Sequence, residues 1–367
     1  MLKRLLTTVV LIISVISYAE ARRFSRIVTP QMFGAIADGN HDDTDAINLA
    51  LKNSRKAYLS KGVYKTSSSI IVPSNTEMWG DGEESRIVNM QKYGFGKTVV
   101  ICGIMDSGLL PGSPNVLTKL KASISTDRKY INIEDADAFS LSKGDYILLT
   151  SGKVGTHNPK FSYVVKAKRI KREKIKVEPS IPYLDFDTIL EVASLSSIQP
   201  VKTEWGVDAY LADDVCIHDI SIEQSVDEGS GMYFLMLSCI NSKFYNLNLK
   251  GNTCIGSNFT VRCIFKNITC SFDGGAVDTP EYCIETIFDN LNGKRYGIRG
   301  NVIGFTILHG YASIIRNCSI DFGGIGKVGV AEQINPIIKN NTFENLSSQG
   351  ACVQLLLMAE RLFKTIE

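Results

Sequence analysis

An aspartate or asparagine that recurs at a regular interval is the feature that most limits how this chain can fold. It stands at Asp219, Asn246, Asn267, Asn290, Asn317 and Asn340, and the interval between copies varies only slightly. A sequence period of about 20 to 50 residues indicates stacked supersecondary units. Each copy is too poor in helix-forming residues for a helical hairpin, so the pattern favours stacked strands.

The residues that follow each copy alternate with the period of a β-strand. One and three places on they are mostly apolar, as in Ile220 and Ile222. Two places on they are small and polar: Ser221, Asn248, Thr269, Asn292, Ser319 and Thr342. Successive side chains of a strand point to opposite faces, so copies stacked in register form an apolar interior column and a polar exterior column. The sequence therefore predicts a β-solenoid whose Asp and Asn residues form turns and stack as a ladder.

A second motif lies in the N-terminal part of the chain, at Phe33–Leu51, Leu59–Tyr64, Trp79–Gly82 and Ser85–Val88. It resembles the opening segment of the pectate lyase superfamily, which includes polygalacturonase-like enzymes, rhamnogalacturonan-degrading proteins and phage tailspikes. The resemblance implies an all-β, right-handed, single-stranded parallel β-helix, in agreement with the repeat. It also implies a polysaccharide as the partner.

A short helix is expected near the start of this motif. Asp42, Asp43 and Thr44 precede the apolar run Ala46–Leu51 and are typical of an N-cap and first turn. The apolar spacing predicts an amphipathic helix that covers the open N-terminal end of the solenoid. Calcium binding by the local acidic residues is the less favoured alternative: Asp38, Asp42, Asp43 and Asp45.

The chain divides into five segments by pattern. Residues 1–21 are expected to be a signal peptide, and residues 22–105 the N-terminal cap and first rungs. Short alternating runs, such as Tyr130–Ile133 and Lys174–Glu178, predict a small β-rich insertion over residues 106–205 that packs on the side of the solenoid. Residues 206–350 form the main rungs, and residues 351–367 are expected to form a C-terminal helix or cap.

The first residues have the pattern of an export signal. Lys3 and Arg4 precede the apolar run Leu5–Ile16, and Ala19-Glu20-Ala21 supplies a cleavage site. The run is too short to cross a bilayer core of roughly 30 Å as a helix, which leaves an uncleaved anchor as the weaker alternative. We expect a secreted or periplasmic protein that begins near Arg22 and has no membrane partner after cleavage.

Charge and cysteine content limit the partners further. The formal net charge of +2 over 367 residues, with both signs interspersed, does not indicate nucleic-acid binding. The nine cysteines are odd in number and lack the paired spacing of a disulfide scaffold or a zinc site, so we expect mostly buried thiols. Nothing in the sequence indicates an oligomeric state.

Two reaction classes fit a polysaccharide partner. Hydrolysis needs a carboxylic acid and a carboxylate, and β-elimination from a uronic acid needs a base and a cation. Calcium is a cofactor candidate only in the second case, and no other cofactor is indicated. The best local carboxylates lie in the Gly-rich segment 273–281, which we expect to be a loop between rungs. The candidate catalytic residues are Asp273, Asp278, Glu281 and His309.

Candidate substrate-binding residues follow in the same region. Cations here could bind a uronate carboxylate, and tyrosines could stack on sugar rings; solvated charges and ordinary packing are the alternatives. These residues are Lys294, Arg295, Arg299, Tyr296 and Tyr311. The column four places after each Asp or Asn mixes charges, which predicts mutual neutralisation: Glu223, Lys250, Ser271, Lys294, Asp321 and Glu344.

These patterns predict an exported protein that cleaves an acidic, uronate-containing polysaccharide by β-elimination or hydrolysis. The motifs of polygalacturonase-like enzymes are not intact, since only His309-Gly310 remains of their Gly-His-Gly. The alternative is therefore a non-catalytic glycan-binding or surface-adhesion β-helix, similar to a tailspike. The two hypotheses differ in whether product is released.

Overall fold

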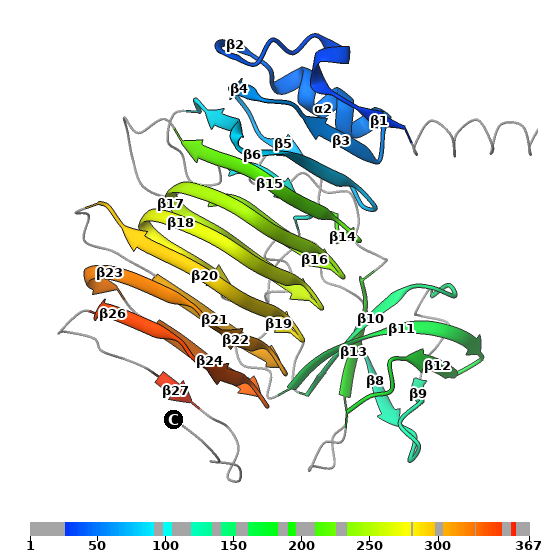
Figure 1. Ribbon diagram of the computed structural model, residues 1–367. Coiled ribbons are helices and arrows are strands. Elements are labelled where there is room, and N and C mark those ends of the chain that lie inside the picture. Colours follow the sequence, from blue (N-terminus) through cyan, green and yellow to red (C-terminus); the bar gives the residue numbers. More distant parts are fainter. Residues whose placement is uncertain are drawn as a thin grey trace, which may run out of the picture.

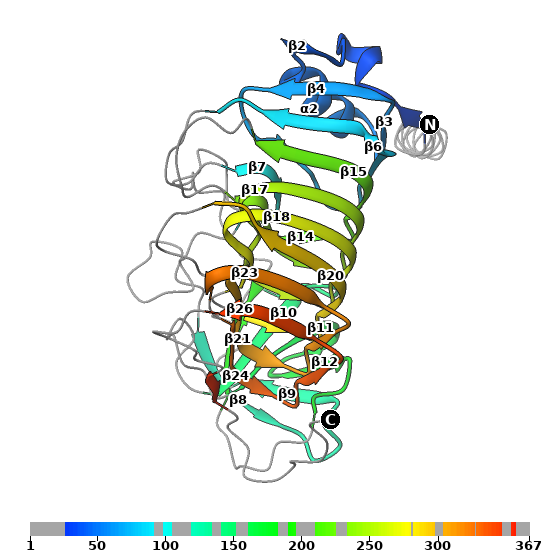
Figure 2. The same cartoon turned by 60° about the vertical axis from the view of Figure 1, so that its left-hand side comes forward.

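The computed structural model describes residues 26–91, 98–104, 119–133, 141–151, 161–182, 190–195, 210–224, 233–279, 282–297, 304–326, 328–346 and 354–356. These residues form a parallel β-helix of about nine turns. A short helix lies at one end of it, and a small antiparallel barrel lies against its side (Figure 1). Figure 2 shows the strands stacked as rungs along one axis.

The N-terminal region contributes the end of the solenoid and its first rungs. Its elements are β1 (Ile27–Val28), η1 (Pro30–Phe33), β2 (Asp38–Asp42), α2 (Thr44–Asn53), β3 (Lys56–Leu59), β4 (Gly62–Thr66), β5 (Ile70–Ile71), β6 (Glu77–Asn89) and β7 (Thr98–Cys102). The predicted cap is confirmed: α2 lies over the end of the stack and buries Ile47 and Leu51 (Figure 1).

The acidic residues before α2 are used locally. Asp43 occupies the N-cap position, but its side chain makes no cap hydrogen bond to the helix. Its carboxylate instead accepts hydrogen bonds from the backbone N–H groups of Ile36 and Ala37, at 2.8 and 3.1 Å. Asp42 accepts a hydrogen bond from the Thr44 hydroxyl at 2.5 Å. These contacts hold the loop that leads into the helix.

The main rungs follow the insertion. Their elements are β14 (Ala212–Asp213), β15 (Cys216–Gln224), β16 (Tyr233–Ile240), β17 (Lys243–Val261), β18 (Ile264–Thr279), β19 (Tyr282–Ile284), β20 (Ile287–Arg295), β21 (Gly304–Tyr311), β22 (Ile314–Arg316), β23 (Ser319–Gly326), β24 (Val328–Ile334), β25 (Ile337–Lys339), β26 (Thr342–Leu346) and β27 (Gln354–Leu356). Each pairs in parallel with the rung before it, and β6 pairs with β15 across the insertion.

The predicted ladder is confirmed in its backbone and its side chains. All six repeat residues, from Asp219 to Asn340, have φ between 52° and 57°, the left-handed region that Asn and Asp tolerate. The Asn267 amide donates to Asn246 Oδ1 at 3.1 Å and accepts from Asn290 Nδ2 at 2.9 Å. Neighbouring rungs are therefore joined at this corner by side-chain hydrogen bonds as well as by the strands.

A second left-handed column stands five positions before the first. Its members have φ between 49° and 55° and include three residue types that rarely adopt this conformation: Asp214, Asn241, Arg262, Glu285, Ala312 and Asn335. Between the two columns lies a short strand of each rung, and its central residue is buried except in β25, where Ile338 is exposed. Phe244, Phe265 and Phe288 stack at this position with centroid distances of 5.0 and 4.8 Å. These rings form the centre of the apolar core.

The insertion is a closed antiparallel barrel. It consists of β8 (Lys119–Ile124), β9 (Tyr130–Ile133), β10 (Tyr146–Ser151), β11 (Phe161–Lys171), β12 (Lys174–Glu178) and β13 (Leu190–Ser194). The predicted packing on the side of the solenoid is confirmed, because barrel residues such as Val164 share one buried cluster with Ile240, Phe259 and Ile284 of the solenoid. The Arg262 guanidinium also donates to the Val164 carbonyl at 3.1 Å.

One expectation about secondary structure is wrong. The segment that begins at Asp273 is not a loop, since Asp273–Thr279 continues β18. Within the expected C-terminal helix or cap, the described residues 354–356 form a strand, β27, that pairs in parallel with β24, and the rest of that segment lies outside the described residues. The export signal lies outside the described residues. None of the helices in the described ranges has the length and apolar character needed to cross a membrane.

The thiol prediction agrees with the structure for the part of the chain that it describes. Eight cysteines there are free thiols, and seven of them are buried. Cys216 is the exception because it is partly exposed.

Candidate functional site

The two candidate catalytic aspartates lie in one strand, β18. Arg295 of β20 donates from Nε to the Asp273 carbonyl oxygen at 3.0 Å, and its Nη2 lies 3.3 Å from Asp273 Oδ1. The side chain of Arg295 is only 4% exposed, so this arginine joins two rungs and is not presented to a uronate. Asp278 is buried as well, with 5% of its surface exposed.

The other candidates are scattered. Lys294 is exposed on β20, and Tyr296, just after that strand, is 46% exposed. Tyr311 packs edge-to-face on Tyr163 of the barrel with ring centroids 5.4 Å apart, so it serves the contact between barrel and solenoid. Glu281 and Arg299 lie outside the described residues, as does the side chain of His309 on β21.

The exterior columns predicted from the repeat are in register. The small polar residues two places after each Asp or Asn pair from rung to rung, and Thr269, Asn292 and Ser319 of this column are exposed. The charged column also pairs in the expected order, and in it Lys250 and Lys294 are exposed on either side of Ser271. We call these two columns, apart from the buried Ser221, the polar face; it consists of Asn248, Thr269, Asn292, Ser319 and Thr342 with Glu223, Lys250, Ser271, Lys294, Asp321 and Glu344.

Charge on the polar face is only partly neutralised. Arg86 forms an ion pair with Glu223 at one end. Near the other end, a hydrogen bond from the Asn345 amide, joined by one from the Gly323 backbone, holds the pKa of Asp321 below its usual value. Lys294 pairs in register with Asp321 and adds to the lowering of its pKa, and Lys250 pairs in register with Glu223. The two exposed lysines in the middle of the face therefore each have a carboxylate on a neighbouring rung.

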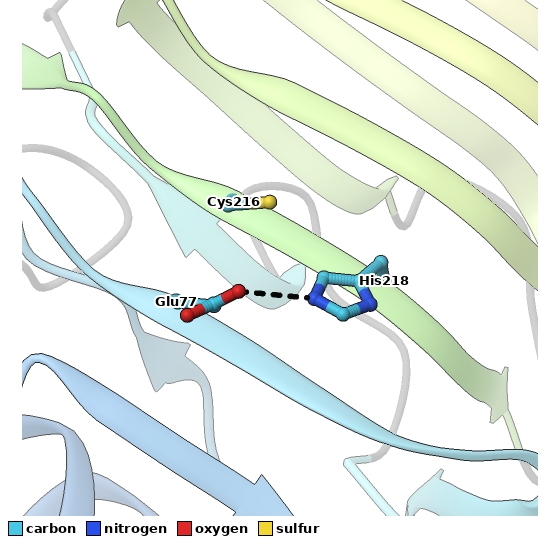
Figure 3. Close-up of side chains that lie close together, drawn as sticks. All are labelled: Glu77, Cys216 and His218. Atoms are coloured by element: carbon cyan, nitrogen blue, oxygen red, sulfur yellow. Dashed lines mark hydrogen bonds and ion pairs between the residues drawn. The ribbon is translucent and has the colours of Figure 1, made fainter. Parts of the chain in front are cut away.

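A cluster that sequence reasoning missed lies on the neighbouring strands β6 and β15. Glu77 pairs in register with Cys216, and Trp79 with His218, so all four side chains share one outer surface. His218 Nε2 lies 3.4 Å from Glu77 Oε1 (Figure 3). The other ring nitrogen, Nδ1, lies 2.6 Å from Asp219 Oδ2. Glu77, Cys216 and His218 each have one possible metal-ligand atom, and these three atoms lie within 4.8 Å of one another.

Neighbouring aromatic rings hold this cluster in place. The His218 ring is stacked between Trp79 and Tyr245, with centroid distances of 6.1 and 4.5 Å. Burial raises the pKa of Tyr245 to about 12, assisted by the adjacent Cys216. Burial also raises the pKa of the Cys216 thiol, and a hydrogen bond with the Tyr245 hydroxyl opposes that shift. The imidazole is therefore confined to one plane, with its two nitrogens facing carboxylates.

The cluster has a faint signal in the sequence. Cys216 and His218 occupy the outward positions of the strand that precedes Asp219, so the repeat places both on one face. Glu77 lies far earlier in the chain, on the other side of the insertion, and no local pattern joins it to them. Only the pairing of β6 with β15 brings the third residue to the other two.

Comparisons with known proteins agree with the fold. Residues 28–132 match the family described as "Rhamnogalacturonase A/epimerase, pectate lyase-like". A pre-neck appendage protein of Bacillus phage B103 is 35% identical over 78 residues, which is 21% of this chain and 9% of that protein. The chain thus spans about a tenth of the length of that curated relative.

Solved structures whose backbones align with most of this chain include a phage tailspike and a surface adhesin. The tailspike protein gp49 of Pseudomonas phage LKA1 is 14% identical, with 87% of this chain and 59% of that one covered and a TM-score of 0.48. The surface adhesin PfbA of Streptococcus pneumoniae is 9% identical, with 87% and 72% covered and a TM-score of 0.39.

Proposed function

We propose that this pectate lyase-like parallel β-helix protein, whose residues 28–132 match the family model, binds an acidic polysaccharide along the polar face without cleaving it. The observation that carries the proposal is the register of the two exterior columns, which place a hydroxyl or amide side chain at each rung and an ammonium group at two of them, Lys250 and Lys294.

The spacing of these groups suits a linear polymer. Parallel strands lie about 4.8 Å apart, so a sugar chain along the solenoid axis would meet similar groups at regular intervals. Hydroxyl and amide side chains such as Thr269 and Asn292 both donate and accept hydrogen bonds, as sugar hydroxyls do. Lys250 and Lys294 lie two rungs apart, roughly 10 Å, and would attract carboxylates of an acidic chain.

The positions of the aspartates favour binding over cleavage. A glycosidase needs one carboxyl group to protonate the leaving oxygen and another to activate water or attack the sugar. Asp273 is engaged by Arg295, and Asp278 is buried in β18. Cleavage by β-elimination or hydrolysis, and with it a role for calcium, stays a prediction that a product assay can test.

The binding test uses purified protein and a panel of labelled acidic polysaccharides. We expect the double variant Lys250→Gln, Lys294→Gln to bind about tenfold more weakly, as the loss of two charge-assisted contacts costs at least about 1.4 kcal/mol. Lys266→Gln is the matched control, because Lys266 is an exposed lysine of β18 outside the polar face. Equal affinity of both variants would contradict the proposed face.

Cleavage is followed in the same samples, with and without calcium. New reducing ends with ultraviolet absorbance of unsaturated ends would establish a lyase, and reducing ends alone a hydrolase. Either product would overturn the non-catalytic part of the proposal. Intact polymer that remains bound would support it.

We also propose that the protein acts outside the cytoplasm. The support is the pattern of Lys3, Arg4 and the apolar run Leu5–Ile16 before Ala21. Amino-terminal sequencing of protein recovered from the periplasm or medium should find a start near Arg22. Full-length chain confined to the cytoplasm would refute export.

A further inference from the structure

Glu77, Cys216 and His218 offer one carboxylate, one thiol and one imidazole to the same point on the surface (Figure 3). These are the three ligand types that zinc takes in proteins, at about 2.0–2.3 Å. Tetrahedral coordination at such distances separates ligand atoms by roughly 3.5 Å. His218 Nε2 and Glu77 Oε1 are already 3.4 Å apart, and one ligand atom from each of the three residues lies within 4.8 Å of the others. A side-chain adjustment of about an ångström, well within rotamer freedom, would complete the geometry.

We infer that these three residues bind one zinc ion at the junction of β6 and β15. The inference goes beyond the proposed polysaccharide binding and does not depend on it. Three protein ligands leave a fourth position, and the Glu77 side chain is 36% exposed, so water can reach the ion.

The surroundings match those of a histidine ligand. Such a histidine usually directs its second nitrogen to a carboxylate, which fixes the ring orientation. Here Asp219 lies 2.6 Å from His218 Nδ1, which leaves Nε2 for the metal. Trp79 and Tyr245 stack on the two faces of the ring and prevent it from turning away. The second carboxylate oxygen of Glu77 lies 3.6 Å from Lys56 Nζ, so that side chain is oriented too.

Cys216 stands apart from the other cysteines in the described part of the chain. The rest are buried thiols of the core, whereas Cys216 is partly exposed and faces outward. A buried cysteine serves packing, but an outward one beside histidine and glutamate has the position of a ligand.

The ion, with its fourth position open, would also link two distant parts of the chain. Glu77 is in the family-matched segment, and Cys216 and His218 follow the insertion, so a metal bridge closes a long segment of the chain that includes the whole barrel. Closing a long segment reduces the conformational entropy of the unfolded chain and thereby stabilises the folded protein.

The test titrates Co²⁺ or Zn²⁺ into purified protein that has been treated with a chelator and kept reduced by a non-thiol reductant. We expect one ion per chain, thiolate-to-cobalt charge-transfer absorption, and a rise in Tm of several degrees with Zn²⁺. Folded protein that shows neither the absorption nor the rise in Tm would overturn the inference.

Variants locate the ion. Cys216→Ser should abolish the charge-transfer absorption, and His218→Gln should lower the affinity for the ion at least about 100-fold. Asp219→Asn should lower it about 10- to 100-fold through the orientation of His218. This last change keeps the ladder, because Asn occupies the same position in five other rungs.

His41→Gln is the matched control, since His41 pairs with Asp38 on the surface at 2.9 Å but belongs to no such cluster in the described residues. It should leave both the absorption and the Tm shift unchanged. Metal binding that is lost in His41→Gln and retained in Cys216→Ser would place the ion elsewhere and refute the site.

Discussion

Asp289 interrupts the side-chain ladder and replaces it with an ion pair. Asn317 donates its amide to Asp289 Oδ1 at 2.9 Å, and Arg316 Nη2 lies 2.8 Å from Oδ2. The hydrogen bond from Arg316, assisted by the one from Asn317 and opposed by burial, holds the pKa of Asp289 below its usual value. Since the unfolded chain has an aspartate pKa near about 3.9, the ionised form stabilises the folded protein above that pH.

We expect Asp289→Asn to lower the free energy of unfolding by about 1–2 kcal/mol at pH 7, the value of a charge-assisted hydrogen bond. The folded pKa is the lower one, so this contribution is present above about pH 4 and is lost as the pH falls through the folded pKa. Urea titrations of both proteins at pH 7, 4 and 3 measure it. A difference that stays constant over this range would contradict the assignment.

At the scale of a turn, the ladder combines two effects in one residue type. Asn267 has φ of 54° and bonds to the asparagines above and below it. Asparagine tolerates left-handed backbone because its short polar side chain bonds locally, whereas alanine does not. The repeat therefore selects Asn both for its backbone conformation and for its contacts with the next rung.

Two substitutions separate these effects. Both Asn267→Ala and Asn267→Gly remove the ladder contacts, but glycine accepts the left-handed conformation. We expect Ala to destabilise the protein more than Gly by about 1 kcal/mol, measured by urea titration. Asn248→Ala, two places after a ladder residue, is the control and should change stability by less than about 0.5 kcal/mol. Equal losses for Ala and Gly would show that the backbone conformation is not limiting.

At the scale of the whole molecule, the barrel and the solenoid share a buried contact. Ile240, Phe259 and Ile284 of the solenoid belong to the same apolar cluster as the barrel interior. Two residues of the second left-handed column add polar contacts, since Arg262 reaches the Val164 carbonyl and Glu285 accepts from the Tyr163 hydroxyl at 3.1 Å. The turns of the solenoid thus provide the docking groups for the barrel.

We expect Arg262→Ala to weaken this docking by about 1–2 kcal/mol. The change also removes contacts of Arg262 with Asn241 and Glu285 on the neighbouring rungs, but the backbone turn should persist, because Ala312 holds the same left-handed position in another rung. Hydrogen exchange should become faster in β11 and stay unchanged in β18. Arg172→Ala, at an exposed turn of the barrel with φ of 50°, is the control. Faster exchange throughout the solenoid would indicate a loss of global stability instead.

Much of the fold follows from the sequence. Alternation and the Asp/Asn period predict the stacked rungs, their exterior columns and the ladder, and the strands Tyr130–Ile133 and Lys174–Glu178 have the expected bounds. These features depend on local alternation and on an internal repeat, and both can be recognised in one sequence without knowledge of the tertiary structure. The cap helix follows in the same way from local apolar spacing.

The tertiary structure alone decided the rest. Gly274 suggested a loop, but it lies within β18, where the Asn252 side chain of the preceding rung occupies the space beside it, 2.0 Å from where a Cβ would be. The second left-handed column shares the period but not the residue type, since its conformation is imposed by the stacked strands. Glu77 meets Cys216 and His218 only because β6 and β15 pair across the insertion. Contacts between rungs depend on register in space, and that register is absent from any local stretch of sequence.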